Sequence, residues 1–378
     1  MTANLNINKA LLPFSWIYGA GVWVRNKLFD RGVLPSEEFP VPVISIGNII
    51  VGGTGKTPHI EYLIRLLKKK YRVAVLSRGY KRKTSGFILA EKTSDSQTIG
   101  DEPFQMYRKF PDVLIAVGAN RRRGIQNLLN LPEEIRPEIV LLDDAFQHRY
   151  VKPSLSILLT TYNYPVEKDC LLPAGKLREN PANKSRADIF IYTKCPSGLE
   201  NISDKTGQTF YTSFRYKGLM PVFPKNCPVV KESIERLEKE NYSLLLITGL
   251  ANPDNMIRYV NNYTSDLQTL IYPDHHDFTE KDIRKICEIF SNIKNSQKIA
   301  LTSEKDAMRL LRNPYVTELL KSHLFYLPIE VIFNFDSEEL FINTIKDHVA
   351  NFKRNRIMAQ TENTRRNKNR NNTGNGLG

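Results

Sequence analysis

Cysteine is scarce in this chain, at 4 of 378 residues. The cysteines lie far apart, and no two have the spacing of a zinc site or a redox pair. This excludes a disulfide framework and predicts reduced, mostly buried thiols in a reducing compartment. The composition is 41% hydrophobic and 25% charged, which is typical of a folded protein, and the length allows two domains.

The N-terminal apolar stretch, residues 10–24, is too short for a membrane-spanning helix, which needs about 20 apolar residues. It holds both tryptophans of the chain, Trp16 and Trp23, whose spacing places them on one face of a helix. Tryptophans with basic flanks favour a helix that lies in a membrane interface. We therefore predict such a helix within residues 1–30. Packing on the protein's own core is the alternative, and one helix can do both with different faces.

Acidic residues are nearly absent from the C-terminus. Residues 351–378 contain seven Lys and Arg against one acid, Glu362, so they contribute +6 to the net charge of +14. The segment has few apolar residues, which is typical of chains that do not fold alone. We predict a disordered basic tail that either aids solubility or contacts anionic lipid or nucleic acid weakly.

What the sequence does contain is a glycine-rich turn between an apolar run and a helical pattern, at residues 44–57. Glycines let backbone N–H groups approach a phosphate, and a helix N-terminus adds partial positive charge. The first glycine of the usual pattern is replaced by Ile50. A glycine-rich turn with an incidental lysine is the alternative. The residues predicted to bind ATP phosphates are Gly52, Gly53, Thr54, Gly55, Lys56, Thr57 and Pro58.

A second apolar run, residues 138–142, ends in two acids, Asp143 and Asp144. Proteins with a phosphate-binding loop hold Mg²⁺ with an acid at such a strand end, directly or through water. The hydroxyl of Thr57 supplies a further ligand. The sequence therefore predicts a Mg²⁺ site formed by Thr57, Asp143 and Asp144.

Strand and helix patterns alternate along the first half. The strand candidates are continuous apolar runs, typical of parallel strands buried on both faces, at residues 41–49, 72–77, 113–117, 138–142 and 155–160. The pattern predicts an α/β fold: a P-loop NTPase-like parallel sheet flanked by helices, with a second, smaller α/β domain. We place the first domain at 31–200, a linker at 201–232 and the second domain at 233–350, whose last helix could pack on the first domain.

Two further clusters combine acids and histidines. Asp101 and Glu102 stand at a probable helix start, where they either complement the helix dipole or serve as a base or metal ligand. His275 and His276 lie between acids. Adjacent ligands without a second cluster make a poor zinc site. A histidine that is oriented by an acid and acts on a proton is the better interpretation.

Taken together, these motifs resemble the tetraacyldisaccharide 4′-kinase family of lipid A synthesis, in order from about residue 10 to 310. The motifs that carry the resemblance are residues 51–58 (VGGTGKTP), 77–80 (SRGY), 100–103 (GDEP), 143–148 (DDAFQH), 172–175 (LPAG), 177–179 (LRE), 274–276 (DHH) and 302–306 (TSEKD).

The resemblance implies transfer of the ATP γ-phosphate to the 4′-hydroxyl of a tetraacylated disaccharide 1-phosphate, an anionic glycolipid. It implies a peripheral, monomeric enzyme on the cytoplasmic face of the inner membrane of a Gram-negative bacterium. Asp101 becomes the candidate base, with His275, or alternatively His276, raising its effectiveness, and Lys56 joins them as a catalytic residue. Candidate contacts to nucleotide or substrate are Tyr80, Arg121, His148 and Arg178.

The main alternative is a P-loop kinase with a soluble acceptor and an internally packed N-terminal helix. A GTPase is less well supported, because the guanine-reading pattern near Thr193 lacks its Asp. A nucleic-acid motor is not favoured, because the aromatic spacing of the base-stacking modules is absent.

Overall fold

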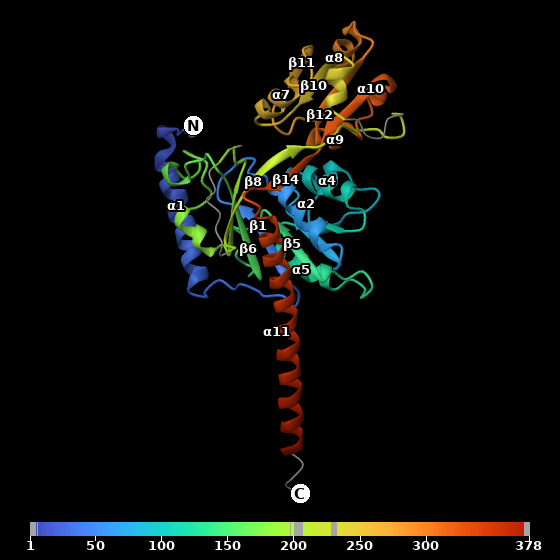
Figure 1. Ribbon diagram of the computed structural model, residues 1–378. Coiled ribbons are helices and arrows are strands. Elements are labelled where there is room, and N and C mark those ends of the chain that lie inside the picture. Colours follow the sequence, from blue (N-terminus) through green and yellow to red (C-terminus); the bar gives the residue numbers. More distant parts are fainter. Residues whose placement is uncertain (1–4, 6, 197, 200–206, 228–232, 374–378) are drawn as a thin grey trace.

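The structure, a computed structural model, contains two sheets, each flanked by helices (Figure 1). It describes residues 5, 7–196, 198–199, 207–227 and 233–373. Side chains in the last helix are described as far as Arg356.

The first sheet has nine strands and is mostly parallel. Only its two edge pairs, β14–β8 and β3–β4, are antiparallel among the pairs described. In spatial order its strands are β14 (Ile329–Phe333), β8 (Thr209–Tyr216), β7 (Ile189–Thr193), β6 (Leu155–Thr161), β1 (Val43–Asn48), β5 (Ile139–Asp143), β2 (Val73–Ser77), β4 (Leu114–Val117) and β3 (Ile88–Leu89).

Helices cover both faces of this sheet, and their apolar sides form its two cores. On one face α2 (Lys56–Leu67), α4 (Asp101–Lys109) and α11 (Glu338–Thr373) supply buried side chains. On the other face α5 (Arg121–Leu129) does so. The remaining helical segments before β8 are η1 (Lys9–Leu11), α1 (Leu12–Asp30), α3 (Ser96–Ile99), η2 (Val166–Lys168) and η3 (Pro181–Arg186).

The second sheet has five strands, parallel except for the short edge pair β13–β9. In spatial order they are β11 (Leu267–Ile271), β10 (Ser243–Thr248), β12 (Lys298–Ser303), β13 (Leu324–Leu327) and β9 (Met220–Pro221). Its helices are α6 (Glu235–Lys239), α7 (Asp254–Asn261), α8 (Glu280–Asn292), α9 (Glu304–Leu310) and α10 (Glu318–His323). This confirms the predicted fold class of a large parallel sheet with a second, smaller α/β unit.

The chain crosses between the sheets twice. It leaves the first sheet after β8 to enter β9, and it returns from β13 to β14. The two crossings touch, because the backbone N–H of Lys217 donates a hydrogen bond of 2.9 Å to the carbonyl of Pro328. The second unit is therefore inserted between two neighbouring strands of the first sheet.

These connections differ from the predicted boundaries. Strand β8 falls in the segment assigned to a linker, 201–232, yet it pairs with β7. Strand β14 was assigned to the second domain, yet it completes the first sheet. Helix α11 packs on the core of the first sheet, which is the alternative that the sequence left open for the last helix. The reason is that pairing partners distant in sequence, not local composition, decide sheet membership. Residues 201–206 and 228–232 of the predicted linker lie outside the described residues.

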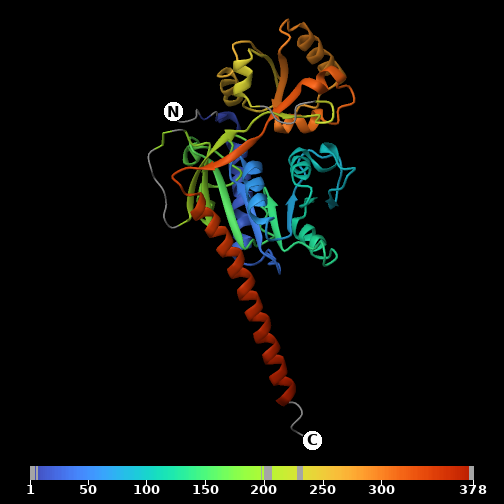
Figure 2. The ribbon, with the colours of Figure 1, turned by 45° about the vertical axis from the view of Figure 1, so that its right-hand side comes forward.

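The C-terminal segment also differs from its prediction. Helix α11 continues through residues 351–373, where we expected a disordered tail, and it projects away from the body in both views (Figures 1 and 2). No glycine or proline interrupts residues 351–373, so local sequence does not end the helix before Gly374. Its first turns are anchored, because Phe341, Ile345 and Val349 are buried against the first sheet.

Candidate active site

The glycine-rich turn joins β1 to α2 at the carboxyl edge of the first sheet. Gly55 precedes the helix with φ 85°, a left-handed conformation that glycine adopts without strain. A side chain on Gly55 would also collide with the ring of Phe214 in β8. The loop is braced from within, because the side-chain amide of Asn48 donates a 2.8 Å hydrogen bond to the hydroxyl of Thr54. Lys56 and Thr57 therefore open α2 at a loop suited to phosphate.

The acid pair lies beside this loop. Lys56 Nζ is 3.6 Å from Asp144 Oδ1, and Arg178 Nη1 donates to both oxygens of Asp144 at 2.8 and 2.9 Å. Burial acts to raise the pKa of Asp144, but the charges of Lys56 and Arg178 outweigh the effect of burial, so the pKa is lowered. Among the described residues, Asp143 receives one side-chain hydrogen bond, from the hydroxyl of Ser77 at 2.8 Å. Burial and the neighbouring charge of Asp144 raise the pKa of Asp143 to about 6.

These residues fit a magnesium ion. A raised pKa on a buried carboxylate means that the site is short of positive charge, which a divalent cation would supply. Within the described part of the chain, no group of three or more His, Cys, Asp or Glu forms a complete metal cage. A phosphate-bound Mg²⁺ does not need one, since one or two carboxylates, waters and phosphate oxygens suffice. The fit rests on Thr57, Asp143 and Asp144.

The second part of the site lies where the two sheets' helices meet. Asp101, the first residue of α4, is 9% exposed and receives hydrogen bonds from the other unit. His275 Nδ1 is 3.1 Å from its Oδ2, and Arg309 donates to both of its oxygens, with Nε 3.1 Å from Oδ1. Burial acts to raise the pKa of Asp101, but the hydrogen bonds from His275 and Arg309 lower it to about 2.

The partners of His275 define its tautomer. Lys305 Nζ lies 2.9 Å from Nε2, and an ammonium can only donate, so Nε2 accepts. Nδ1 then carries the proton and donates it to Asp101. Arg309 Nη2 also lies 2.9 Å from Nδ1, but its N–H is directed to the carboxylate. His275 has φ 64°, so the loop itself is bent to present this ring.

The neighbouring His276 points elsewhere. Its Nε2 is 2.9 Å from Asp282 Oδ2, and its ring stacks on Tyr272 with centroids 4.6 Å apart. Both partners belong to the second unit. Of the two adjacent histidines, only His275 contacts Asp101.

The four candidate contact residues are found in different settings. Tyr80 is exposed and its ring meets His275 edge-on at 5.6 Å. Arg178 holds Asp144, as described above. Arg121 is buried and donates to three backbone carbonyls, including that of Asp143 at 3.3 Å. Burial and the charge of Arg121 lower the pKa of His148 to about 4, so His148 is neutral at physiological pH.

Sequence reasoning missed Arg309 and Phe214. Arg309 lies three residues after the TSEKD motif, and its side chain reaches Asp101, 208 positions away in sequence. Its spacing from Asp306 on one helix face, with a contact of 3.5 Å, was the available signal. Phe214 carried no local signal, because only the pairing of β8 with β7 brings it to the phosphate loop.

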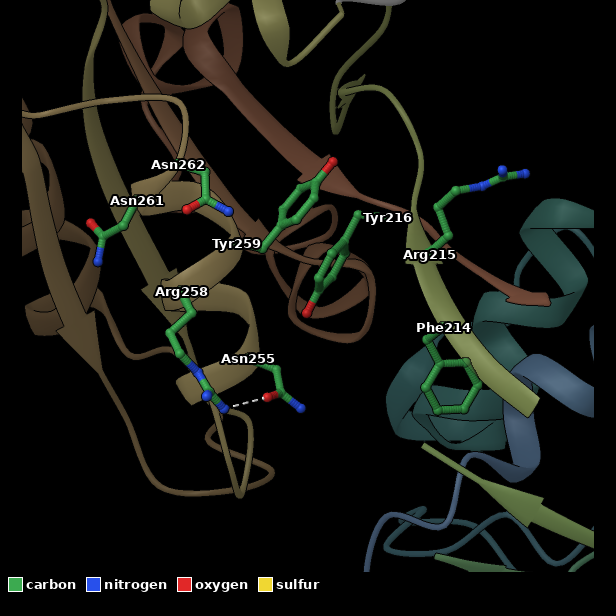
Figure 3. Close-up of a pocket in the computed structure, with 8 residues that line it drawn as sticks. All are labelled: Phe214, Arg215, Tyr216, Asn255, Arg258, Tyr259, Asn261 and Asn262. Atoms are coloured by element: carbon green, nitrogen blue, oxygen red, sulfur yellow. Dashed lines mark hydrogen bonds between the residues drawn. The ribbon is translucent and has the colours of Figure 1, made fainter. Parts of the chain in front are cut away.

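A cavity of about 760 Å³ opens between β8 and α7 (Figure 3). Phe214, which also packs on Gly55, lies on its β8 side. The rings of Tyr216 and Tyr259 lie together across it, with centroids 4.5 Å apart. Its remaining lining residues are polar or charged: Arg215, Asn255, Arg258, Asn261 and Asn262.

Helix α1 presents an apolar face to the outside. Trp16 and Trp23 are 71% and 62% exposed, and Phe14, Ile17 and Val24 are exposed beside them. The described part of the chain contains no helix that is both long and apolar enough to cross a membrane.

The opposite side of α1 is fastened to the first unit. The hydroxyl of Ser15 donates to the carbonyl of Leu171 at 2.9 Å, and that of Tyr18 donates to the carbonyl of Arg178 at 2.8 Å. One face of the helix is therefore held by the protein, and the other is free.

The site combines a glycine loop at the start of a helix, an acid pair beside the loop's lysine, and a second unit at the same edge of the sheet. This combination defines a P-loop enzyme of phosphoryl transfer. Residues 7–350 match the family described as tetraacyldisaccharide-1-P 4′-kinase, and the chain belongs to that family.

Relatives and a solved structure agree with this assignment. The tetraacyldisaccharide 4′-kinase of Phocaeicola vulgatus is 47% identical, covering 94% of this chain and 99% of that protein. The one from Porphyromonas gingivalis is 44% identical, covering 90% and 96%. A crystal structure of LpxK from Aquifex aeolicus, described as an "apo" form in complex with ATP, matches with a TM-score of 0.70 and 30% identity. It covers 90% of this chain and 98% of that one.

Proposed function

We propose that this protein transfers the γ-phosphate of ATP to the 4′-hydroxyl of tetraacyldisaccharide 1-phosphate, an anionic glycolipid. The observation that carries the proposal is the double role of Arg178. Its side chain binds Asp144 beside the phosphate loop, and its backbone carbonyl accepts the hydroxyl of Tyr18 in α1. The phosphate site is thus tied directly to a helix with an exposed apolar face, which a kinase of soluble acceptors does not need.

ATP is the proposed donor and Mg²⁺ the proposed metal. Backbone N–H groups of residues 52–58, at the N-terminus of α2, would hold the phosphates, with Lys56 on the terminal ones. Bound Mg²⁺ would neutralise charge on the phosphates during transfer. The cavity between β8 and α7 is our candidate for the nucleoside, because it adjoins the phosphate loop at Phe214 and offers aromatic faces with amide partners.

Asp101 is the proposed acceptor of the hydroxyl proton, positioned by His275. With a pKa near 2 in this arrangement, Asp101 is ionised at neutral pH, the form that accepts a hydrogen bond from a hydroxyl. Phosphoryl transfer usually has a loose transition state, so a carboxylate that orients the hydroxyl contributes even when it is a weak base. Tyr80, which meets His275, and the neutral His148 are proposed substrate contacts, whereas Arg121 would act by holding Asp143.

The exposed face of α1 is the proposed contact with the cytoplasmic face of the inner membrane, where a lipid substrate and ATP meet. One chain supplies both halves of the site, so the proposal requires only a monomer, and it requires no nucleic acid. Burying two tryptophans in the interface would contribute a few kcal/mol of binding energy. Trp16→Ala with Trp23→Ala should therefore weaken binding to anionic vesicles by at least about tenfold.

The test is transfer of ³²P from γ-labelled ATP to tetraacyldisaccharide 1-phosphate in detergent, with Lys56→Ala as the inactive control. A labelled bis-phosphorylated lipid made by the wild type alone is the expected result. If the wild type binds ATP but labels no lipid, the acceptor assignment is wrong and a soluble acceptor becomes the better candidate.

A further inference from the structure

A buried charge cluster joins three helices that carry the candidate active site. Lys109 Nζ lies 2.6 Å from Glu61 Oε2 and 2.5 Å from Glu304 Oε1. The side chains of Glu61 and Glu304 are 1% and 9% exposed, so water does little to stabilise either charge. Gln105 donates a further hydrogen bond of 2.8 Å to Glu61. We call Lys109, Glu61 and Glu304 the Lys109 cluster.

Each member of the cluster belongs to a different part of the site. Glu61 is in α2, the helix that begins at the phosphate loop. Lys109 is the last residue of α4, which begins at Asp101. Glu304 is the first residue of α9, which belongs to the second unit and carries Arg309.

Helices α4 and α9 are therefore fastened to each other at both ends. The start of α4 contacts the end of α9 through Asp101 and Arg309, and the end of α4 contacts the start of α9 through Lys109 and Glu304. At 1.5 Å per residue, the two contacts are separated by about 12 Å along α4. A single contact would let the short helix α9 pivot, whereas two contacts at this separation fix its direction.

Glu304 also reaches the connection between the two units. Burial and the charge of Glu61 raise the pKa of the Glu304 carboxyl, and the nearby backbone N–H of Ile329, the first residue of β14, acts in the opposite direction. The preceding Pro328 accepts the hydrogen bond from Lys217 that joins the two crossings. The cluster thus lies beside the connection between the two units.

We propose that Lys109 is a positioning residue for the transfer reaction: by holding Glu304 it keeps α9 aligned on α4, so that Arg309 and His275 stay on Asp101. The inference rests on the proposed function for the reaction it serves, but the alignment itself is a property of the fold. Buried ion pairs add little net stability, yet they fix one geometry, since misalignment leaves a charge unpaired.

The first test compares hydrogen exchange in wild type, Lys109→Met and Lys109→Arg, with Lys68→Met as a matched control. Lys68 forms a surface ion pair with Asp112, at 2.9 Å, that lies wholly within the first unit. We expect Lys109→Met to raise exchange at least about tenfold in residues 304–311 and 272–278, at the interface. Exchange in α5 and α8, each inside one unit, should not change.

The same variants separate alignment from substrate binding. In Lys109→Met we expect kcat to fall between about 10- and 100-fold, since small misplacements of reacting groups cost this much, with KM for ATP changed less than about threefold. Lys109→Arg keeps the charge and should restore most of the rate, and Lys68→Met should match the wild type. Unchanged exchange at the interface, or an equal rise in every segment, would overturn the proposal.

Glu304→Gln is the second variant, in case Lys109→Met does not fold. Gln has nearly the same shape as Glu, and burial together with the charge of Glu61 raises the pKa of Glu304 by disfavouring its charged form, so the neutral amide fits this position without leaving a charge unpaired on it. Glu304→Gln leaves the contact between Lys109 and Glu61 in place. Faster exchange confined to the interface would support the proposal, and wild-type exchange would overturn it. Neither readout requires lipid phosphorylation, so a failure of the proposed function would be recognised separately.

Discussion

Asp101 and Asp143 are buried to nearly the same extent, 9% and 7% exposed, yet their pKa values move in opposite directions. Burial acts to raise both. At Asp101, His275 and Arg309 outweigh it, and the pKa falls to about 2. At Asp143 the charge of a neighbouring acid, Asp144, adds to the effect of burial, and the pKa rises to about 6.

The difference teaches what each carboxylate still needs. Asp101 is fully compensated by groups of the chain itself, all from the other unit, so its charge holds the two units together. Asp143 is under-compensated, because the cations beside it are directed to Asp144. The charge of Asp101 is balanced without a ligand, whereas Asp143 lacks positive charge that a bound cation would supply.

The strongest way to break the comparison is to remove the compensation at Asp101. Arg309→Met leaves a buried carboxylate whose remaining partners from the described part of the second unit are the hydrogen bond of His275 and the more distant charge of Lys305. Removing one member of a buried ion pair typically costs about 3–5 kcal/mol, and we expect an unfolding free energy lower by that amount in urea titrations. Adding Asp101→Asn should restore part of it. If Arg309→Met unfolds like the wild type, Asp101 is not held as described.

Removing the lysine of the other site should act on rate instead. Lys56→Ala deletes a cation that faces both the acid pair and the proposed phosphate position. We expect kcat to fall roughly 10²–10³-fold, as for the loss of one preorganised donor to a developing charge. Steady-state transfer assays measure the loss, with Lys69→Ala, an exposed lysine just after the same helix, as control. A loss below tenfold would remove Lys56 from the proposed mechanism.

Neutralising Asp143 should sharpen the comparison by stabilising the protein. The pKa of Asp143 in the folded state lies above the ordinary 3.8. Its contribution to the free energy of unfolding is therefore greatest when Asp143 is protonated, and this contribution is lost as pH rises from about 4 to 6. Asp143→Asn should therefore raise the unfolding free energy at pH 8 by roughly 1–3 kcal/mol, measured without Mg²⁺.

The matched variant Asp101→Asn should have the opposite sign. The pKa of Asp101 is depressed, so the stability that Asp101 contributes to the folded state is present above about pH 4 and is lost as pH falls toward 2. Asp101→Asn should lower stability at pH 8. Mg²⁺ should stabilise the wild type but do so less in Asp143→Asn, because binding to the folded state is weakened there. Equal signs for the two variants would show that burial, not partners, dominates.

The smallest expected effect on the transfer rate is the difference between substitutions of the two adjacent histidines. His275→Gln removes the ring that donates to Asp101, and we expect kcat to fall about tenfold, less than the loss of a base itself. His276→Gln changes the contacts with Asp282, Tyr272 and Phe278 inside the second unit, so transfer should change less than about threefold. Comparing the two in the same assay checks it, and equal losses would mean that the contact between His275 and Asp101 does not matter for transfer.

Local features were predictable from the sequence. Short patterns of glycine, acidic and apolar residues predicted the phosphate loop, the acids after residues 138–142 and the parallel sheet. The predicted fold class is confirmed. The roles of the predicted site residues stay predictions. The contacts of Arg309 and Phe214 were not predicted. Contact between the two units brings Arg309 to its partner, and sheet pairing brings Phe214 to its partner, and no local sequence pattern encodes either.

The insertion of the second unit has a consequence for the order in which the protein is made. Translation delivers the phosphate loop early, but β14 and the anchoring turns of α11 emerge only after the whole inserted unit. Domains generally fold as they are synthesised. The inserted unit can thus fold on the ribosome before the first sheet has its last strand, and the phosphate loop gains its full supporting core only after the inserted unit has been made. An incomplete chain would therefore carry the loop without the core that supports it.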